Sequence, residues 1–556
     1  MNKHILKAIF CAAMALPVFT SCELDQFPTD SLTEKESWKS YSDAVNQYNG
    51  LLATLRADIG GANAYVGDVQ TDLFNQRLTS AQLSNINDWS FTGSQFSGDV
   101  VWANNYAVIL QANFILQNIG KFDNDESLTA RQRANIANIK ATSYFARAYA
   151  YSSMLPYYCK DYEPETAKQE MGLPIVEEVS SEARPARATL QETCDTIIHY
   201  MDCAKQEFDK VDEYNKTATS SNKITATTAV PDSNAVTALR ARHYLYMHKY
   251  AEAIKEAEKI QENYPLAQGN DKLLELWLLD QGNEIVYQPV QTPDEVTNTY
   301  GIYLSFNIVN ENLVQDLRGM NPDYIPTQNL LNLYSNNDYR RSIYFSHKTD
   351  GENSMYLAFG TPSGYEFGDL YGDSKIYTTD IISTSGQTVD GVIFTKFAGN
   401  PLLRKQGYWF SEIYNMSKAF RSAEAYLIIA EASIRLGDEE KAREELNMLR
   451  ESRFDHYTDD EDNTDYIRDN VTGEALEKVM EDEWTREFVG EGYRFACLKR
   501  WHKGFQRTPQ HFNAPVLVAT GGVQTLKVNA NNIRFTWPIP QQDMQANKNL
   551  KQNEGY

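Results

Sequence analysis

The chain has 556 residues, of which 42% are hydrophobic and 23% charged, a composition typical of a folded globular protein that buries a large core. The formal net charge of −23 at pH 7 repels phosphate backbones and so argues against nucleic acid as a partner. No apolar stretch beyond the N-terminal segment is long enough to span a bilayer.

The N-terminal segment, residues 1–21, has the features of a lipoprotein signal peptide. Lys3 and Lys7 accompany an apolar stretch that runs from Ile5 to Phe19, and two small polar residues then lead to Cys22. The stretch is broken by a proline and is shorter than the roughly 20 residues of a transmembrane helix. We therefore predict cleavage before Cys22 and lipid attachment to its thiol, which would anchor the protein to a membrane. The alternative is an ordinary signal peptide with an incidental cysteine.

The rest of the chain divides by its periodicity. Residues 22–35 are predicted to form a lipidated tether, and helical spacing then dominates residues 36–265. Between residues 266 and 415 this spacing fades while glycine, asparagine, threonine and tyrosine accumulate, which predicts a loop-rich insert. Helices return over residues 416–505, and residues 506–556 are predicted to form an irregular tail.

The first helix is expected just after the tether. Ser31 and Glu34 form a capping-box pattern at its start. Apolar residues then recur at helical spacing, at Trp38, Tyr41, Val45, Tyr48, Leu52 and Leu55.

Small and aromatic residues recur in the helical parts with the spacing of tetratricopeptide repeats, which are about 34 residues long. One pair of helices is centred near Tyr244 and Ala253, and a second near Tyr426 and Ala442. Small residues let paired helices approach closely, and stacked pairs bury a continuous face. We therefore predict a mostly α fold, a tetratricopeptide-like helical-repeat scaffold that holds a loop-rich insert carrying short strands.

Four cysteines remain in the predicted folded body, and they contain no Cys-x-x-Cys pair. This spacing argues against a zinc site and favours isolated buried thiols, while a disulfide between distant positions stays open. The four are Cys159, Cys194, Cys203 and Cys497.

Several local motifs resemble those of one protein family. In chain order they are the helix 139–149 with its exit 155–158, then 172–176, 338–341, 396–397, 421–432, 486–495, 537–540 and 549–556. In this order they resemble the SusD-like (SusD/RagB) nutrient-binding lipoproteins. The resemblance covers residues 22–556 and implies a single SusD-like domain at the outer membrane, facing the cell exterior. It also implies a SusC-like TonB-dependent outer-membrane transporter as the partner.

Most residues of these motifs are predicted to be structural. Arg421, Glu424 and Glu431 lie at helical spacing, and Arg486 and Glu487 follow in the next helical part, which indicates buried or half-buried ion pairs between stacked helices. Three tryptophans are likewise expected in the core, at positions Trp484, Trp501 and Trp537.

The ligand site is expected among polar and aromatic residues outside the repeats, because a sugar ring offers an apolar face for stacking and a polar rim for hydrogen bonds. In the resembled family a loop after the first helix supplies an arginine and an aromatic residue to the ligand. That resemblance implies Arg77 and Trp89, with Asp68 and Asn75 beside them, while Asp72 is expected to tie down its own loop. The start of the insert adds three further candidates, Tyr300, Tyr303 and Tyr324. Core packing is the alternative for each aromatic residue.

Catalytic motifs are absent from the sequence. It contains no His-Glu-x-x-His, no Gly-x-Ser-x-Gly and no phosphate-binding glycine loop, so we predict that the protein is not an enzyme. A glycosidase needs only two facing carboxylates, which no motif would reveal. No cofactor or metal is predicted. The acidic run 459–465 could hold a structural Ca²⁺, but its spacing does not match an EF-hand and favours a solvated loop.

The predicted function is that of a cell-surface lipoprotein that binds a glycan (oligosaccharide) and delivers it to a TonB-dependent outer-membrane transporter. Two alternatives stay open. One is a peptide-capturing member of the same family, and the other is a helical-repeat interaction scaffold.

Overall fold

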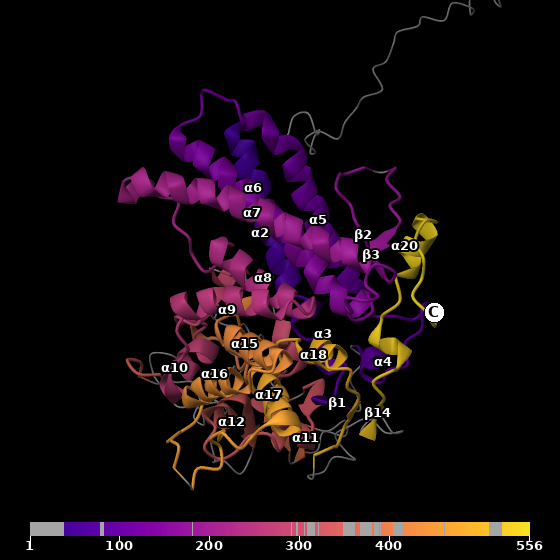
Figure 1. Cartoon of the computed structure of the whole chain (residues 1–556), viewed down its shortest axis with the longest axis vertical. Coiled ribbons are helices and arrows are strands. Elements are labelled where there is room, and N and C mark those ends of the chain that lie inside the picture. Colours follow the sequence, from indigo (N-terminus) through magenta and orange to yellow (C-terminus); the bar gives the residue numbers. More distant parts are fainter. Residues whose placement is uncertain are drawn as a thin grey trace, which may run out of the picture.

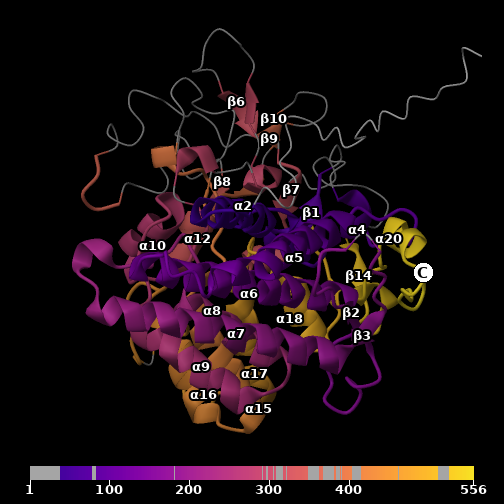
Figure 2. The same cartoon turned by 90° about the horizontal axis from the view of Figure 1, so that it is seen from above.

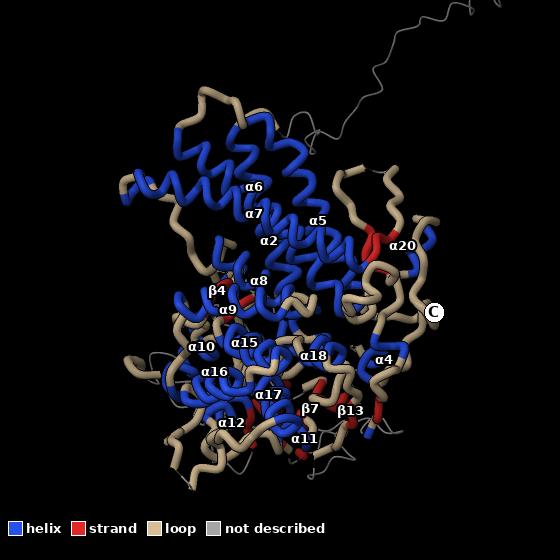
Figure 3. Tube along the Cα trace, viewed as in Figure 1, coloured by secondary structure: helices blue, strands red, loops and turns tan. Residues whose placement is uncertain are grey.

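A computed structural model describes most of the chain from residue 38 onwards. The described residues are 38–77, 83–180, 182–290, 292–295, 299–304, 306–308, 317–320, 322–347, 362–366, 381–382, 388–389, 391–403, 415–460, 462–510 and 525–556. Helices dominate them, with short strands between (Figure 3). The predicted mostly α fold is therefore confirmed. The predicted signal peptide, the tether and Cys22 lie outside the described residues, and the proposed domain boundaries stay predictions.

Helices α2, α5, α6 and α7 lie side by side in the upper part of Figure 1. Helix α6 packs between α5 and α7, and α2 packs on α5. Capping boxes define the starts of α6 and α7, where Thr129 and Thr189 each accept a hydrogen bond from the backbone three residues on. The bounds are α2 (Tyr41–Ile59), α3 (Val66–Val69), α4 (Ser84–Asn87), α5 (Asp99–Ile119), α6 (Ala130–Tyr158) and α7 (Leu190–Thr217).

Helix α2 begins later than the sequence predicts. Ser40 is its N-cap, and the Asp43 carboxylate accepts the Ser40 backbone N–H at 2.7 Å, which completes a capping box. Trp38 was expected on this helix but precedes it, with its ring against Phe114 and Phe122. The predicted box at Ser31 and Glu34 lies outside the described residues.

The two predicted repeats form two pairs of helices that stack on each other. Helix α9 packs on both α8 and α15, and α15 packs on α16, so repeats far apart in sequence share one interface. Fully buried alanines such as Ala253, Ala257 and Ala430 allow this close approach. The bounds are α8 (Ser233–Tyr246), α9 (Tyr250–Asn263), α15 (Ala423–Leu436), α16 (Glu439–Glu451), α17 (Gly473–Phe488) and α18 (Arg494–Arg500).

The predicted insert contains short strands and helices. Strands β6, β9 and β10 lie on one side of the molecule, opposite α9, α15 and α16 (Figure 2). The described elements are α10 (Gly269–Leu278), β4 (Ile285–Tyr287), β5 (Phe306–Ile308), β6 (Leu317–Met320), β7 (Tyr324–Pro326), α11 (Gln328–Leu331), α12 (Tyr339–Tyr344), β8 (Phe345–His347), β9 (Ile381–Ile382), β10 (Thr388–Val389) and β11 (Val392–Phe394).

The strands form small sheets that join distant parts of the chain. One sheet has the order β10-β9-β6-β5, and β11 pairs with β8. Strand β1 (Phe74–Gln76) pairs antiparallel with β7, with Asn75 opposite Ile325, so the N-terminal segment and the insert share a sheet. The remaining elements are β2 (Met171–Pro174), β3 (Arg187–Thr189), β12 (Phe420–Arg421), β13 (Phe505–Gln506), β14 (Lys527–Val528) and α20 (Gln541–Ala546).

A buried ionic network joins the insert to the C-terminal helices. Arg453 lies 2.9 Å from Glu284 and 3.0 Å from Glu487, and Arg421 contacts the same two carboxylates. Arg340 adds a contact of 2.7 Å to Glu487. These five side chains are 0–1% exposed. The predicted ion pairs are buried as expected, and Glu424 pairs with Arg242 of another helix. Arg421, however, lies on β12 rather than on a helix, and Arg486 pairs with Glu483 of its own helix.

The last described segment, residues 525–556, packs against the core. Trp537 is fully buried, its backbone N–H donates to the Tyr157 carbonyl at 2.7 Å, and its indole N–H donates to Gln70 at 3.0 Å. Trp484 and Trp501 are 3% and 7% exposed, so all three tryptophans lie in the core as predicted. Within the part of the chain described, no helix is both long and apolar enough to cross a bilayer.

Candidate functional site

The first predicted site segment, residues 65–77, is locked against the turn between α17 and α18. The buried Asp68 carboxylate accepts backbone hydrogen bonds from Gly490 at 2.6 Å, Gly492 at 3.0 Å and Arg494 at 2.9 Å. Both glycines have φ of +83°, a conformation that lets their N–H groups converge on one carboxylate. Burial raises the pKa of Asp68 to about 6, against the lowering effect of these bonds. Asp68 therefore has a structural role here.

Asp72 also ties this segment to α18. Its carboxylate accepts two hydrogen bonds from the Arg494 guanidinium, at 2.9 and 2.8 Å, in a bidentate pair. The interpretation that Asp72 fixes its own loop agrees with this geometry.

Asn75 and Arg77 lie on and just after β1. Asn75 is 1% exposed, and neither amide atom has a hydrogen-bond partner among the described residues. The backbone N–H of Arg77 donates to the Asp323 carbonyl at 2.9 Å, which extends the pairing of β1 with β7. Burial lowers the pKa of the Arg77 guanidinium, and the nearby Asp323 carboxylate raises it in part. Arg77 thus places a positive charge directly after β1.

Trp89 is enclosed by aromatic rings. It is 5% exposed, its indole N–H donates to the Gln70 carbonyl at 2.6 Å, and its ring meets the edges of Phe505 and Phe535 at centroid distances of 5.7 and 4.9 Å. A ring packed in this way offers no open face to a sugar. The structure therefore favours the core-packing alternative for Trp89.

The three predicted tyrosines are also core residues. Tyr300, Tyr303 and Tyr324 are 2%, 0% and 0% exposed. Tyr300 stacks on Phe397 with centroids 3.7 Å apart, and its hydroxyl lies 3.0 Å from the Ser417 hydroxyl. Their regular occurrence at the start of the insert reflects a second hydrophobic cluster beneath it, which also contains Phe397.

A small polar pocket of about 140 Å³ lies where the N-terminal helices, the insert and the C-terminal helices meet. Its charges are balanced, because Arg242 pairs with Glu424 at 2.6 Å and Lys418 with Asp280 at 2.7 Å. Tyr300 also lines it. Pockets for drug-sized ligands measure about 300–1,000 Å³, so this one suits water or a small polar molecule rather than an oligosaccharide.

A larger pocket of about 390 Å³ lies beside the end of α6 and is open to solvent. Its walls come from residues 160–171, 499–502 and 530–554, segments distant in sequence. At its edge the structure brings together Asp161, Glu163 and His502. Sequence reasoning missed these three residues. The short spacing of Asp161 and Glu163 was visible, but nothing local linked them to a histidine on another helix.

The cysteines and the acidic run fit their sequence interpretations. Cys159, Cys194 and Cys497 are buried free thiols, and Cys203 is a partly exposed one. Within the described part of the acidic run, the side chains of Asp459, Asp460 and Asp462 are exposed to solvent.

Comparison with known proteins gives the family. Residues 211–556 match the model of the SusD family. The chain belongs to the SusD family. Residues 24–245 of this SusD-family protein also match a model described as "Starch-binding associating with outer membrane". The Starch-binding protein SusD of Bacteroides thetaiotaomicron is 34% identical over 140 residues, which are 25% of this chain and 21% of that protein.

Solved structures show the same fold. A SusD superfamily protein from Bacteroides thetaiotaomicron superposes with a TM-score of 0.68 at 19% identity, over 93% of this chain and 100% of its own. Surface glycan-binding protein A from Bacteroides fluxus gives a TM-score of 0.61 at 16% identity, over 93% and 100%. The fold of this SusD-family member is thus shared along nearly its whole length.

Proposed function

We propose that this protein is a lipid-anchored glycan-binding protein of the outer membrane, facing the cell exterior. It captures an oligosaccharide and passes it to a SusC-like TonB-dependent transporter. The observation that carries the proposal is membership of the SusD family, together with one further matching model and two similar proteins whose descriptions name starch or glycan binding. The proposed lipid anchor is Cys22, directly after the apolar N-terminal stretch.

We further propose that ligand binds near the end of the β1–β7 sheet, with Arg77 as a donor. Arg77 is the one cation among the predicted residues. Asp68, Trp89 and the three tyrosines are buried in core packing, and Arg77, itself 7% exposed, brings a positive charge to the position just after β1. A guanidinium suits sugar hydroxyls because it presents several N–H donors in one plane.

Binding of the soluble chain from residue 23 to polysaccharides, oligosaccharides and a peptide mixture tests the proposal, by affinity gel and calorimetry. We expect a glycan ligand, bound at least about tenfold more weakly by Arg77→Ala, since a charged hydrogen bond contributes about 1.5–3 kcal/mol. The melting temperature of each variant is measured alongside. Arg131→Ala, an exposed arginine on α6, serves as the matched control and should bind like wild type.

The outcomes separate the alternatives. Binding to peptides alone would replace the glycan by a peptide and keep the capture role. Equal glycan affinity in Arg77→Ala and wild type would move the site away from the β1–β7 sheet. Absence of any small ligand would favour an interaction scaffold, and release of products from a glycan would reveal an enzyme.

A further inference from the structure

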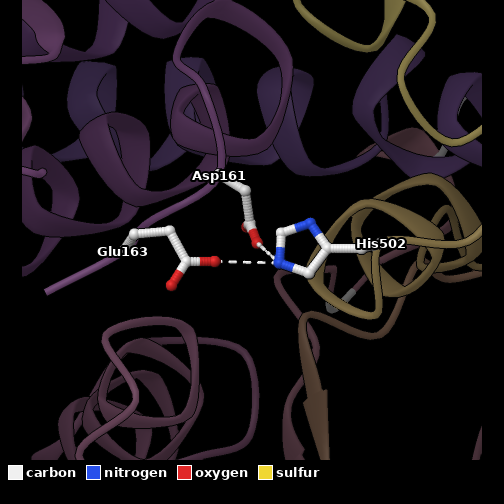
Figure 4. Close-up of side chains that lie close together, drawn as sticks. All are labelled: Asp161, Glu163 and His502. Atoms are coloured by element: carbon white, nitrogen blue, oxygen red, sulfur yellow. Dashed lines mark hydrogen bonds and ion pairs between the residues drawn. The ribbon is translucent and has the colours of Figure 1, made fainter. Parts of the chain in front are cut away.

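Three side chains of types that can bind a metal ion meet where the chain leaves α6 and α18 (Figure 4). Asp161 and Glu163 follow α6, and His502 follows α18. Glu163 Oε1 lies 2.8 Å from His502 Nε2, and Asp161 Oδ2 lies 3.7 Å from the same nitrogen. All three ligand atoms are within 4.8 Å of one another. Two carboxylates that lie 339 and 341 positions before His502 in the sequence thus approach its Nε2 atom.

Asp161 itself points to a missing ligand. Its side chain is 10% exposed, and no described residue donates a hydrogen bond to its buried Oδ2. In Figure 4 this oxygen is directed at the imidazole nitrogen of His502. A buried acceptor without a donor costs about 1–3 kcal/mol, so such groups are rare unless something absent from the protein chain satisfies them. Burial also raises the pKa of the Asp161 carboxyl.

Neighbouring cations do not fill this role, because they are engaged elsewhere. The Lys499 ammonium donates to the Pro156 carbonyl at 2.7 Å, and the Arg500 guanidinium donates to Glu431 at 2.8 Å. Both cations lower the pKa of Asp161 through space, but neither forms a hydrogen bond with it among the contacts described. The cluster therefore keeps two carboxylates facing one imidazole.

The backbone fixes the positions of these ligands. The turn after α6 is closed by the Glu163 carbonyl, which accepts hydrogen bonds from Thr166 at 3.0 Å and Ala167 at 2.8 Å. The N–H of His502 donates to the Lys499 carbonyl at 3.0 Å, which holds the histidine at the end of α18. The backbone that carries the ligands is thus ordered, while the side chains of His502 and Glu163 are 62% and 38% exposed.

We propose that Asp161, Glu163 and His502 form a binding site for a divalent transition-metal ion, with Zn²⁺ the best match. Imidazole nitrogen and carboxylate oxygen bind Zn²⁺ at about 2.0–2.2 Å, so tetrahedral ligands lie roughly 3.3–3.5 Å apart. The observed distances of 2.8 and 3.7 Å to His502 Nε2 lie on either side of this value. Ca²⁺ is a poorer match because it takes oxygen ligands.

The site would join two halves of the fold. It links the end of the N-terminal helical layer to the end of α18, and it opens on the 390 Å³ pocket that Asp161 and His502 also line. Three protein ligands leave a fourth position to water or to a ligand in this pocket. The inference does not rest on the proposed glycan binding.

Calorimetric titration of the untagged chain from residue 23 with Zn²⁺ tests the site. We expect one ion per chain and, at a concentration 100-fold above Kd, a rise in melting temperature of about 2 °C. Co²⁺ should give the visible absorption of a tetrahedral site. Asp161→Asn and His502→Gln should each weaken binding at least tenfold and abolish the thermal shift, with unchanged circular dichroism in the absence of metal.

His456→Gln is the matched control. His456 also lies 3.7 Å from a carboxylate, that of Asp455, but its side chain is 94% exposed and belongs to no three-ligand cluster of described residues. This variant should bind Zn²⁺ like wild type. The proposal fails if wild type binds no Zn²⁺, if Asp161→Asn and His502→Gln bind it unchanged, or if Ca²⁺ binds as tightly as Zn²⁺.

Discussion

Trp89 illustrates how a residue in a polar loop becomes part of the core. It follows Asn87 and Asp88, and this setting suggests an exposed ring. Its φ of +57° turns the side chain inward, and its aromatic partners Phe505 and Phe535 come from the other end of the chain. The local sequence therefore indicates a turn at Trp89, but it does not reveal the distant aromatic residues that enclose the ring.

Trp89→Ala should destabilise the protein rather than weaken ligand binding directly. Removing a buried tryptophan costs about 3–5 kcal/mol, through lost burial and the cavity left behind. Urea unfolding at pH 7 measures this loss, and Trp89→Phe should lose clearly less because a ring remains among the same neighbours. Unchanged stability together with lost glycan binding would return Trp89 to the ligand site.

At the scale of the helix, α17 carries acidic residues whose charge is fixed by arginines. Burial alone would raise the pKa of Glu487, but the guanidinium groups of Arg453, Arg421 and Arg340 outweigh it and hold this pKa well below 4.5. In the turn after α17, Arg421 and Lys396 lower the pKa of Glu491 in the same way. A carboxyl with a lowered folded-state pKa stabilises the fold above its unfolded pKa and loses that contribution in acid.

Glu487→Gln should therefore destabilise the protein by about 3–5 kcal/mol at pH 7, because it leaves buried guanidinium groups without their partner. The difference from wild type should stay constant down to about pH 4.5 and then shrink by about 1.4 kcal/mol per pH unit. Urea unfolding of both proteins between pH 7 and pH 3.5 measures it.

Glu213→Gln provides the control for this prediction. Its pair with Lys216 has both side chains 70% exposed at 2.7 Å, so its removal should change little at any pH. A Glu487→Gln deficit that stays constant below pH 4.5 would contradict the assigned charge state.

The helical pairs were predictable because their signals are local. Tyr244 and Tyr426 each sit in a periodic pattern of small and aromatic residues that specifies a helix and its partner within one repeat. The site was not predictable in the same way. Tyr303 and Trp89 are aromatic residues of the type that binds sugars. Only the folded structure shows that other side chains bury them. His502 likewise becomes a candidate metal ligand only because the fold brings it close to Asp161, on another segment.

At the scale of the whole molecule, contacts cross between all parts of the chain. β1 pairs with β7 of the insert, Asp68 holds the turn before α18, and Arg453 bridges Glu284 and Glu487. No helical layer could lose these contacts without leaving buried charges unpaired. The helices and the insert should therefore unfold together.

Circular dichroism and tryptophan fluorescence during urea unfolding should share one midpoint, since the first reports mainly the helices and the second includes Trp277 on α10 of the insert. Asp68→Asn should lower both midpoints equally, because its carboxylate bonds link the N-terminal segment to α18. Two separated transitions in wild type would show that the insert unfolds independently.

The carboxylate of Asp68 also sets an order of events during synthesis. Its hydrogen-bond donors lie 422, 424 and 426 residues further along the chain, so a ribosome has made most of the protein before this residue finds its partners. Contacts between such distant residues form late, because closing a long loop costs entropy before it is rewarded. A nascent chain of this kind stays incompletely folded until its final segments emerge, and that open state is the one a protein needs for threading through a membrane.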